Sequence, residues 1–207
     1  IRLWNECLDL CTARPSPLNS ADRFLVMAPV VTIRGTRSAL GFYRTLKREV
    51  IERLVRGVGA IVPEERFRLL WDNIAIWYRL YRFFHPFMDA GACFVADTYT
   101  NAWTIEIDLE EPLTSLARAY TAVFINVDLP TRLRTIADLA QRYQVDGMVM
   151  HANRYCKPFS ITQNAVRDGL RDELGLPVLI LEADMCDARL YNEGAVRERT
   201  TAFLEML

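Results

Sequence analysis

Apolar positions in the first 60 residues recur with the spacing of α-helices. Residues 1–14 form an amphipathic pattern that ends before Pro15. A longer pattern runs from Thr36 to Gly57, with Pro63 beyond it as a helix-stopping signal. One face of this second helix collects its apolar side chains, which are Leu40, Tyr43, Leu46, Val50, Ile51 and Leu54. We therefore expect residues 1–63 to form a helical segment.

From about residue 65 the pattern changes to short apolar runs separated by helical stretches. The runs that predict strands are 67–71, 93–96, 122–127, 147–150 and 177–182. Helices are predicted at about 72–89 with a kink near Pro86, and at 111–119, 131–143, 160–174 and 193–206. Strands that alternate with helices are typical of βαβ units, so we predict α/β domains with parallel sheets of the flavodoxin or Rossmann type. The predicted division is a middle domain over 64–128 and a C-terminal domain over 129–207, with the pairing into one or two sheets left open.

Composition narrows the class of protein without identifying it. The 207 residues are 51% hydrophobic and 25% charged, which is ordinary for a soluble globular chain. A net charge of −1 argues against nucleic acid as a partner, and no apolar run reaches the roughly 18 residues of a membrane span. Since the chain begins with Ile1 and shows no signal-peptide pattern, we expect a processed or partial chain.

The cysteines are odd in number and irregularly spaced, at positions 7, 11, 93, 156 and 186. This pattern argues against a disulfide framework and favours the reducing cytoplasm. Without a Cys-x-x-Cys pair, a self-contained zinc or ferredoxin-type cluster is not expected. Cys7 and Cys11 have a spacing that suits a metal, but their apolar neighbours favour a helix core. Cys93 lies in an apolar strand and is expected in the core, while Cys186 is open to either interpretation.

Polar residues gather where the predicted strands end, in segments 72–77, 97–103, 151–158 and 183–189. Ligands of open parallel sheets bind outside the carboxyl ends of the strands. His151 ends a strand and is the better of two histidines for proton transfer. Trp77 and Trp103 are candidates for an aromatic pocket, although tryptophans commonly fill cores. Loops after strands are also polar without any function, so the pattern alone leaves the two interpretations level.

The segment HANRYCKPFS carries the most chemical information. Cys156 lies near Arg154 and Lys157 and just before a predicted helix, a setting that favours the thiolate form. Thiolates are the ligands that iron and zinc prefer. From these residues alone, a bystander cysteine is the commoner case.

Several motifs occur together between Asp146 and Leu207. They are Asp-Gly before a strand, the Cys-Lys-Pro loop, Gly-x-Pro before an apolar strand, Glu-x-Asp-x-x-Asp-x-Arg after it, and a closing RTTAFLEML helix. This combination resembles the C-terminal domain of the benzoyl-CoA reductase/2-hydroxyacyl-CoA dehydratase family, which includes the 2-hydroxyglutaryl-CoA dehydratase D-component. The wording HANRYCKP is most similar to the benzoyl-CoA reductase branch. FRLLWDNIAIW and ADTYTNAW extend the resemblance to about residue 66, so that it covers roughly two thirds of the chain.

The resemblance implies an oxygen-sensitive iron–sulfur enzyme. Subunits of the family are longer, and their [4Fe-4S] clusters are held by cysteines from separate domains. A separate iron–sulfur activator hydrolyses ATP and delivers electrons that ferredoxin supplies. By resemblance, Cys156 is the C-terminal cluster ligand. The middle-domain ligand of many members falls near Tyr99, which cannot simply replace a thiolate, so that ligand lies elsewhere or the cluster is modified or absent.

We therefore expect a subunit of an ATP-dependent benzoyl-CoA reductase-like complex, paired with a homologous cluster-bearing subunit and acting on an aromatic acyl-CoA. The alternatives are a 2-hydroxyacyl-CoA dehydratase subunit and a scaffold subunit without a cluster. His151 and Tyr99 are the predicted catalytic residues and Cys156 the metal ligand. The predicted substrate contacts are Trp77, Trp103, Asn153, Arg154 and Lys157.

Overall fold

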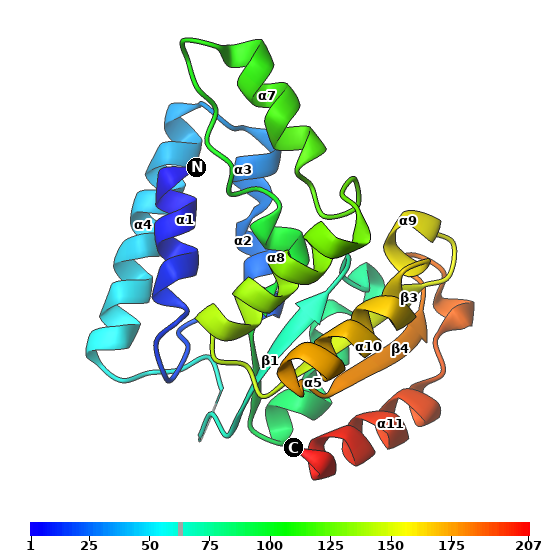
Figure 1. Ribbon diagram of the computed structural model, residues 1–207. Helices are drawn as coiled ribbons and strands as arrows, with labels where there is room; N and C mark the ends of the chain where they lie inside the picture. Colours follow the sequence, from blue (N-terminus) through cyan, green and yellow to red (C-terminus); the bar gives the residue numbers. More distant parts are fainter. Residues whose placement is uncertain (62–63) are drawn as a thin grey trace.

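The computed structural model describes residues 1–61 and 64–207, and in them it contains one sheet of four parallel strands flanked by helices (Figure 1). The strands are β1 (Phe67–Asp72), β2 (Ala92–Asp97), β3 (Gly147–Asn153) and β4 (Val178–Ala183). Their order is β2-β1-β3-β4, and every neighbouring pair is parallel. The predicted α/β class is confirmed, and four of the five predicted strands occur.

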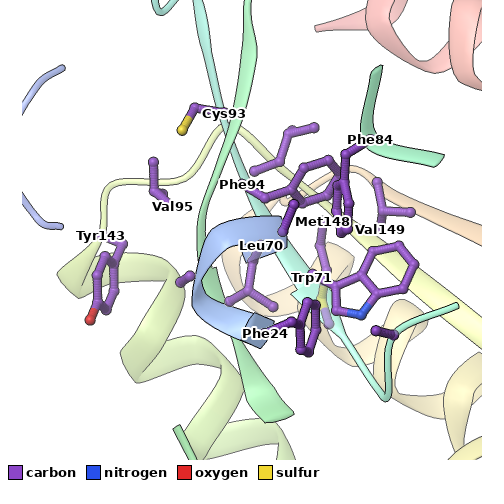
Figure 2. Close-up of a cluster of buried hydrophobic side chains, with 14 of the residues drawn as sticks. Phe24, Leu70, Trp71, Phe84, Cys93, Phe94, Val95, Tyr143, Met148 and Val149 are labelled. Atoms are coloured by element: carbon purple, nitrogen blue, oxygen red, sulfur yellow. The ribbon is translucent and has the colours of Figure 1, made fainter. Parts of the chain in front are cut away.

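The strands form because both faces of the sheet are covered, which suits continuous apolar runs. Trp71 of β1 is fully buried and packs edge-to-face on Phe83, Phe84 and Phe94, with ring centroids 5.0, 5.4 and 5.9 Å away. Figure 2 shows Trp71 among the buried side chains of neighbouring elements. Such aromatic burial is the main source of stability in this core.

Helices cover the two faces of the sheet and form a layer before it. The N-terminal helices are α1 (Arg2–Leu10), α2 (Ser20–Val26), α3 (Ala28–Thr32) and α4 (Arg37–Val55). The later ones are α5 (Leu80–Asp89), α6 (Thr98–Asn101), α7 (Pro112–Thr121), α8 (Leu129–Arg142), α9 (Lys157–Ser160), α10 (Gln163–Leu174) and α11 (Glu193–Met206), with short 3-10 turns η1 (Trp77–Arg79) and η2 (Ala188–Leu190). Successive strand residues face opposite sides. Trp71 meets the phenylalanines of α5, whereas Asp72 pairs with Arg132 of α8, so α5 and α8 cover opposite faces.

The strand predicted at residues 122–127 is wrong, because this segment forms turns between α7 and α8. Its most buried aromatic residue, Phe124, packs on Phe159 at a centroid distance of 5.3 Å. Short apolar runs bury side chains equally well from a turn, and periodicity alone does not separate the two cases. Helices α2 and α3 were not predicted. The helix predicted over 1–14 ends at Leu10, and the one over 160–174 is divided into α9 and α10.

The predicted apolar face of α4 is only partly buried. Tyr43, Leu46 and Val50 lie in the core, but Leu40 and Ile51 are 43% and 40% exposed. Cys7, Cys11 and Cys93 are fully buried, as predicted. Within the described residues, no helix combines the length and the apolar character that a membrane span requires.

One sheet draws strands from both predicted α/β ranges, since β1 pairs with β3. The open question of one or two sheets is thereby settled for the described residues. Pro63, which marks the predicted boundary between the helical segment and the middle domain, lies outside those residues. The division into three domains stays a prediction.

Candidate functional site

The four segments that leave the strands lie at one edge of the sheet, because all four strands are parallel. Three hydrogen bonds join the loops there. Arg154 N donates to Ala183 O at 3.0 Å, and Trp77 N donates to Met185 O at 3.3 Å. The Tyr78 hydroxyl lies 3.4 Å from Asp187 O. The loops after β1, β3 and β4 therefore form one connected surface, where ligands of such sheets bind.

A buried polar network fixes the end of β1. Asn73 has a φ of 92°, a left-handed conformation that costs a non-glycine residue about 1–3 kcal/mol. Its Nδ2 donates to His151 O at 2.6 Å, and its backbone N donates to Thr98 Oγ1 at 3.0 Å. Thr98 in turn donates to Asp72 at 2.9 Å, and Asp72 pairs with Arg132 at 2.7 Å. Sequence reasoning missed these residues; Asn directly after a strand was the available signal, because asparagine tolerates this conformation.

His151 lies inside the protein rather than on its surface. Its side chain is fully buried, and its Nδ1 is 2.8 Å from Ile74 O, so that Nδ1 carries the proton and donates. Burial lowers the pKa of His151 below its usual value, which keeps the imidazole neutral near pH 7. Nε2 is left as a buried acceptor without a partner among the described residues.

Asn153 lies two residues after His151 on the same side of β3. It is fully buried, and neither its Oδ1 nor its Nδ2 has a partner within the described part of the chain. Buried polar atoms without partners are rare because each costs about 1–3 kcal/mol. Asn153 and His151 thus offer three hydrogen-bonding atoms that a bound water or ligand would satisfy.

Cys156 follows Asn153 and precedes α9 with its side chain half-buried. Ser160 Oγ donates to Asn153 O at 2.9 Å and fixes the start of this loop. Arg154 is exposed and pairs with Glu182, with Nε 2.8 Å from Oε1. Lys157 is exposed. The cysteine is therefore accessible, and the charge of one neighbouring cation is already compensated.

Tyr99 and Trp77 belong to one aromatic cluster. Their ring centroids are 6.3 Å apart, and both contact Phe24 of α2 at 5.8 Å. Sequence reasoning missed Phe24. Burial raises the pKa of Tyr99, which keeps its hydroxyl protonated. Trp103 has a different neighbour, since the guanidinium of Arg34 lies 5.7 Å from its ring centroid.

The donor set fits part of an iron–sulfur site. Burial raises the pKa of the Cys7 thiol to about 12 and also raises those of Cys11 and Cys93, so these three are poor thiolate donors. Cys156 is half-buried and Cys186 exposed, on the loops after the paired strands β3 and β4. Among residues 1–61 and 64–207, no three His, Cys, Asp or Glu side chains gather as metal ligands. Because [4Fe-4S] clusters commonly take four cysteines, this chain supplies only some of the ligands.

The buried imidazole predicts an acid-sensitive fold. Since the pKa of His151 is lower in the folded state, the unfolded state binds more protons below about pH 6.5, and stability falls as pH drops from there. We expect the free energy of unfolding to fall by up to about 1.4 kcal/mol per pH unit from this group. Urea unfolding of wild type and His151→Gln between pH 7.5 and 5 measures this. The exposed His85 gives the matched control, His85→Gln, and equal slopes in all three proteins would contradict the prediction.

The fold and the strand-end site define an α/β enzyme subunit with an accessible loop cysteine beside an aromatic cluster. Comparison with known sequences then places it: the chain belongs to the 2-hydroxyglutaryl-CoA dehydratase D-component family, whose sequence model matches residues 1–207. The membership predicted from residues 66–207 is confirmed, and it extends to the N-terminal helices as well.

Three relatives illustrate the range of the family. The alpha subunit of lactoyl-CoA dehydratase from Anaerotignum propionicum is 29% identical over 205 residues, which cover 99% of this chain and 49% of the relative. One of the subunits of benzoyl-CoA reductase from Thauera aromatica is 28% identical over 212 residues, covering 97% and 49%. The alpha subunit of (R)-2-hydroxyisocaproyl-CoA dehydratase from Clostridioides difficile is 26% identical over 207 residues, covering 100% and 50%. The chain thus spans about half the length of these relatives, which are subunits of acyl-CoA dehydratases or reductases.

Proposed function

We propose that this chain forms part of a catalytic subunit of a heteromeric acyl-CoA enzyme, and that Cys156 is one of its iron ligands. The observation that carries the proposal is an accessible thiol at the end of β3, in a family of acyl-CoA dehydratase and reductase subunits. A homologous cluster-bearing subunit, an ATP-hydrolysing activator and ferredoxin are the proposed partners.

In this proposal a [4Fe-4S] cluster would supply single low-potential electrons, and the protein would position the substrate. Cys156 would hold iron through Sγ, with the remaining ligands coming from outside the described residues or from Cys186. The ammonium of Lys157 would offset negative charge at the thioester. Trp77 and Tyr99 would provide an aromatic surface for the acyl group, and Asn153 and neutral His151 would offer hydrogen bonds to it.

The reaction we favour is reduction of an aromatic acyl-CoA ring, because the loop HANRYCKP is most similar to the benzoyl-CoA reductase branch and aromatic side chains lie at the same edge of the sheet. The second candidate is elimination of water from a 2-hydroxyacyl-CoA, supported by the dehydratase names among the relatives. Both reactions would use the same electron supply.

The test is made on the anaerobically purified complex with its natural partner subunits. Iron and acid-labile sulfide are measured first, and about four irons assignable to this subunit are expected. Benzoyl-CoA, lactoyl-CoA and 2-hydroxyisocaproyl-CoA are then incubated with ATP, activator and reductant. A ring-reduced product identifies a reductase, and an enoyl-CoA product identifies a dehydratase. Iron confined to the partner subunits would overturn the assignment of Cys156 and leave this chain as a scaffold.

A further inference from the structure

A cavity of about 390 Å³ lies between α1, the end of α3 and the start of α4, away from Cys156. Its apolar wall includes Leu40, which the sequence predicts on the core face of α4 but which is 43% exposed. Three arginines, Arg2, Arg34 and Arg37, complete the lining, and the lining contains no Asp or Glu. The cavity thus combines an apolar floor with concentrated positive charge.

The arginines are held by the connection between α3 and α4. Gly35, at φ 82°, makes the turn that brings Arg34 and Arg37 to the same cavity. Arg34 Nε donates to Val30 O at 2.9 Å, which fixes the guanidinium. Among the described residues, neither Arg34 nor Arg37 forms an ion pair, and Arg2 pairs only with the exposed Glu106 at 3.6 Å.

Uncompensated guanidinium groups in a concave space select anions, and their planar donors suit phosphate oxygens. Arg37 is also the first residue of a 19-residue helix, whose N-terminal end favours negative charge. The ligand that fits is therefore an anion, with phosphate preferred, attached to a less polar group that meets Leu40 and Tyr43.

The cavity borders the strand-end site through Trp103. This residue comes two positions after α6, at the end of β2, and its ring lies under the Arg34 guanidinium at 5.7 Å. Its Nε1 is buried and has no partner in the part of the chain that the structure describes. We propose that this cavity binds the phosphate groups of the coenzyme A ester whose acyl end lies at the strand ends. The inference rests on the proposed function for the identity of the ester.

Calorimetric titration of the anaerobic complex tests the site with three probes: coenzyme A, dephospho-coenzyme A and pantetheine, which has no phosphoanhydride. We expect coenzyme A to bind, pantetheine to bind at least tenfold more weakly, and Arg34→Gln and Arg37→Gln each to weaken coenzyme A binding about tenfold. Arg48→Gln, an exposed arginine on the same helix, is the matched control and should bind as wild type does. Circular dichroism confirms that each variant is folded.

Two results would overturn the site: unchanged coenzyme A affinity in both cavity variants, or ADP binding as tightly as coenzyme A with the same arginine dependence. Steady-state kinetics adds an independent readout, because the variants should raise KM for an acyl-CoA about tenfold and leave KM for the matching acyl-pantetheine unchanged. Binding does not depend on turnover. Arginine-dependent binding of coenzyme A by a complex that converts no ester would therefore keep the site and reject the proposed reaction.

Discussion

Cys156→Ser is expected to remove the iron assigned to this subunit and to reduce conversion of every acyl-CoA tested to below detection. Serine keeps the size of the side chain, but its hydroxyl is not deprotonated near neutral pH and is a poor ligand for iron. Because Cys156 is half-buried in a loop and packs into no core, the substitution should leave folding intact. Iron analysis and the electronic spectrum of the anaerobic complex give the readout, with circular dichroism to confirm the fold.

The matched variant is Cys186→Ser, which changes the exposed thiol on the neighbouring loop. If Cys156 alone supplies the thiolate, Cys186→Ser should retain full iron and activity. Equal iron loss in both variants would show that the two loops ligate together, and full iron in Cys156→Ser would reject the assignment of Cys156.

The sheet could be predicted from the sequence because its strands are buried on both faces. FRLLW and GMVM are continuous apolar runs, and such runs between helical stretches signal parallel strands. AVFINV has the same appearance but no place in the sheet. Its Phe124 packs against Phe159 from a turn, which a local pattern does not distinguish from a strand.

The site could be predicted only as far as strand ends are local. The segments after the strands were identified, and the structure brings three of them together through hydrogen bonds between loops. The burial of His151 under Ile74 depends on a contact between residues 77 positions apart, which no local pattern contains. Helix α2 could have been found, because Asn19 and Asp22 form a reciprocal capping box. The full burial of Arg23 could not, since arginine is almost never buried unless paired, and its partner is distant in sequence.

Arg23→Ala is expected to destabilise the protein by about 3–5 kcal/mol, because it leaves a buried carboxylate without its cation. Arg23 and Asp97 are both fully buried, and their ion pair measures 3.0 Å from Nη2 to Oδ2. Burial alone would lower the pKa of Arg23, but the attraction of Asp97 outweighs it and leaves the pKa raised. The guanidinium also donates to Phe94 O at 3.0 Å and to Val95 O, which fastens α2 to the edge strand β2.

The loss should reach the site as well as the fold, because Asp97 also caps α6. Its Oδ1 accepts from Thr100 N at 2.6 Å, and α6 carries Tyr99. Chemical unfolding of Arg23→Ala, Asp97→Ala and the double variant gives the coupling free energy. The double variant should be less destabilised than the sum of the single ones, since it leaves no unpaired buried charge. Lys47→Ala is the control, because its pair with Glu6 is solvent-exposed and contributes about 0–1 kcal/mol. Additive losses, or a loss in Arg23→Ala no larger than in Lys47→Ala, would show that the pair does not hold α2 and α6 on the sheet.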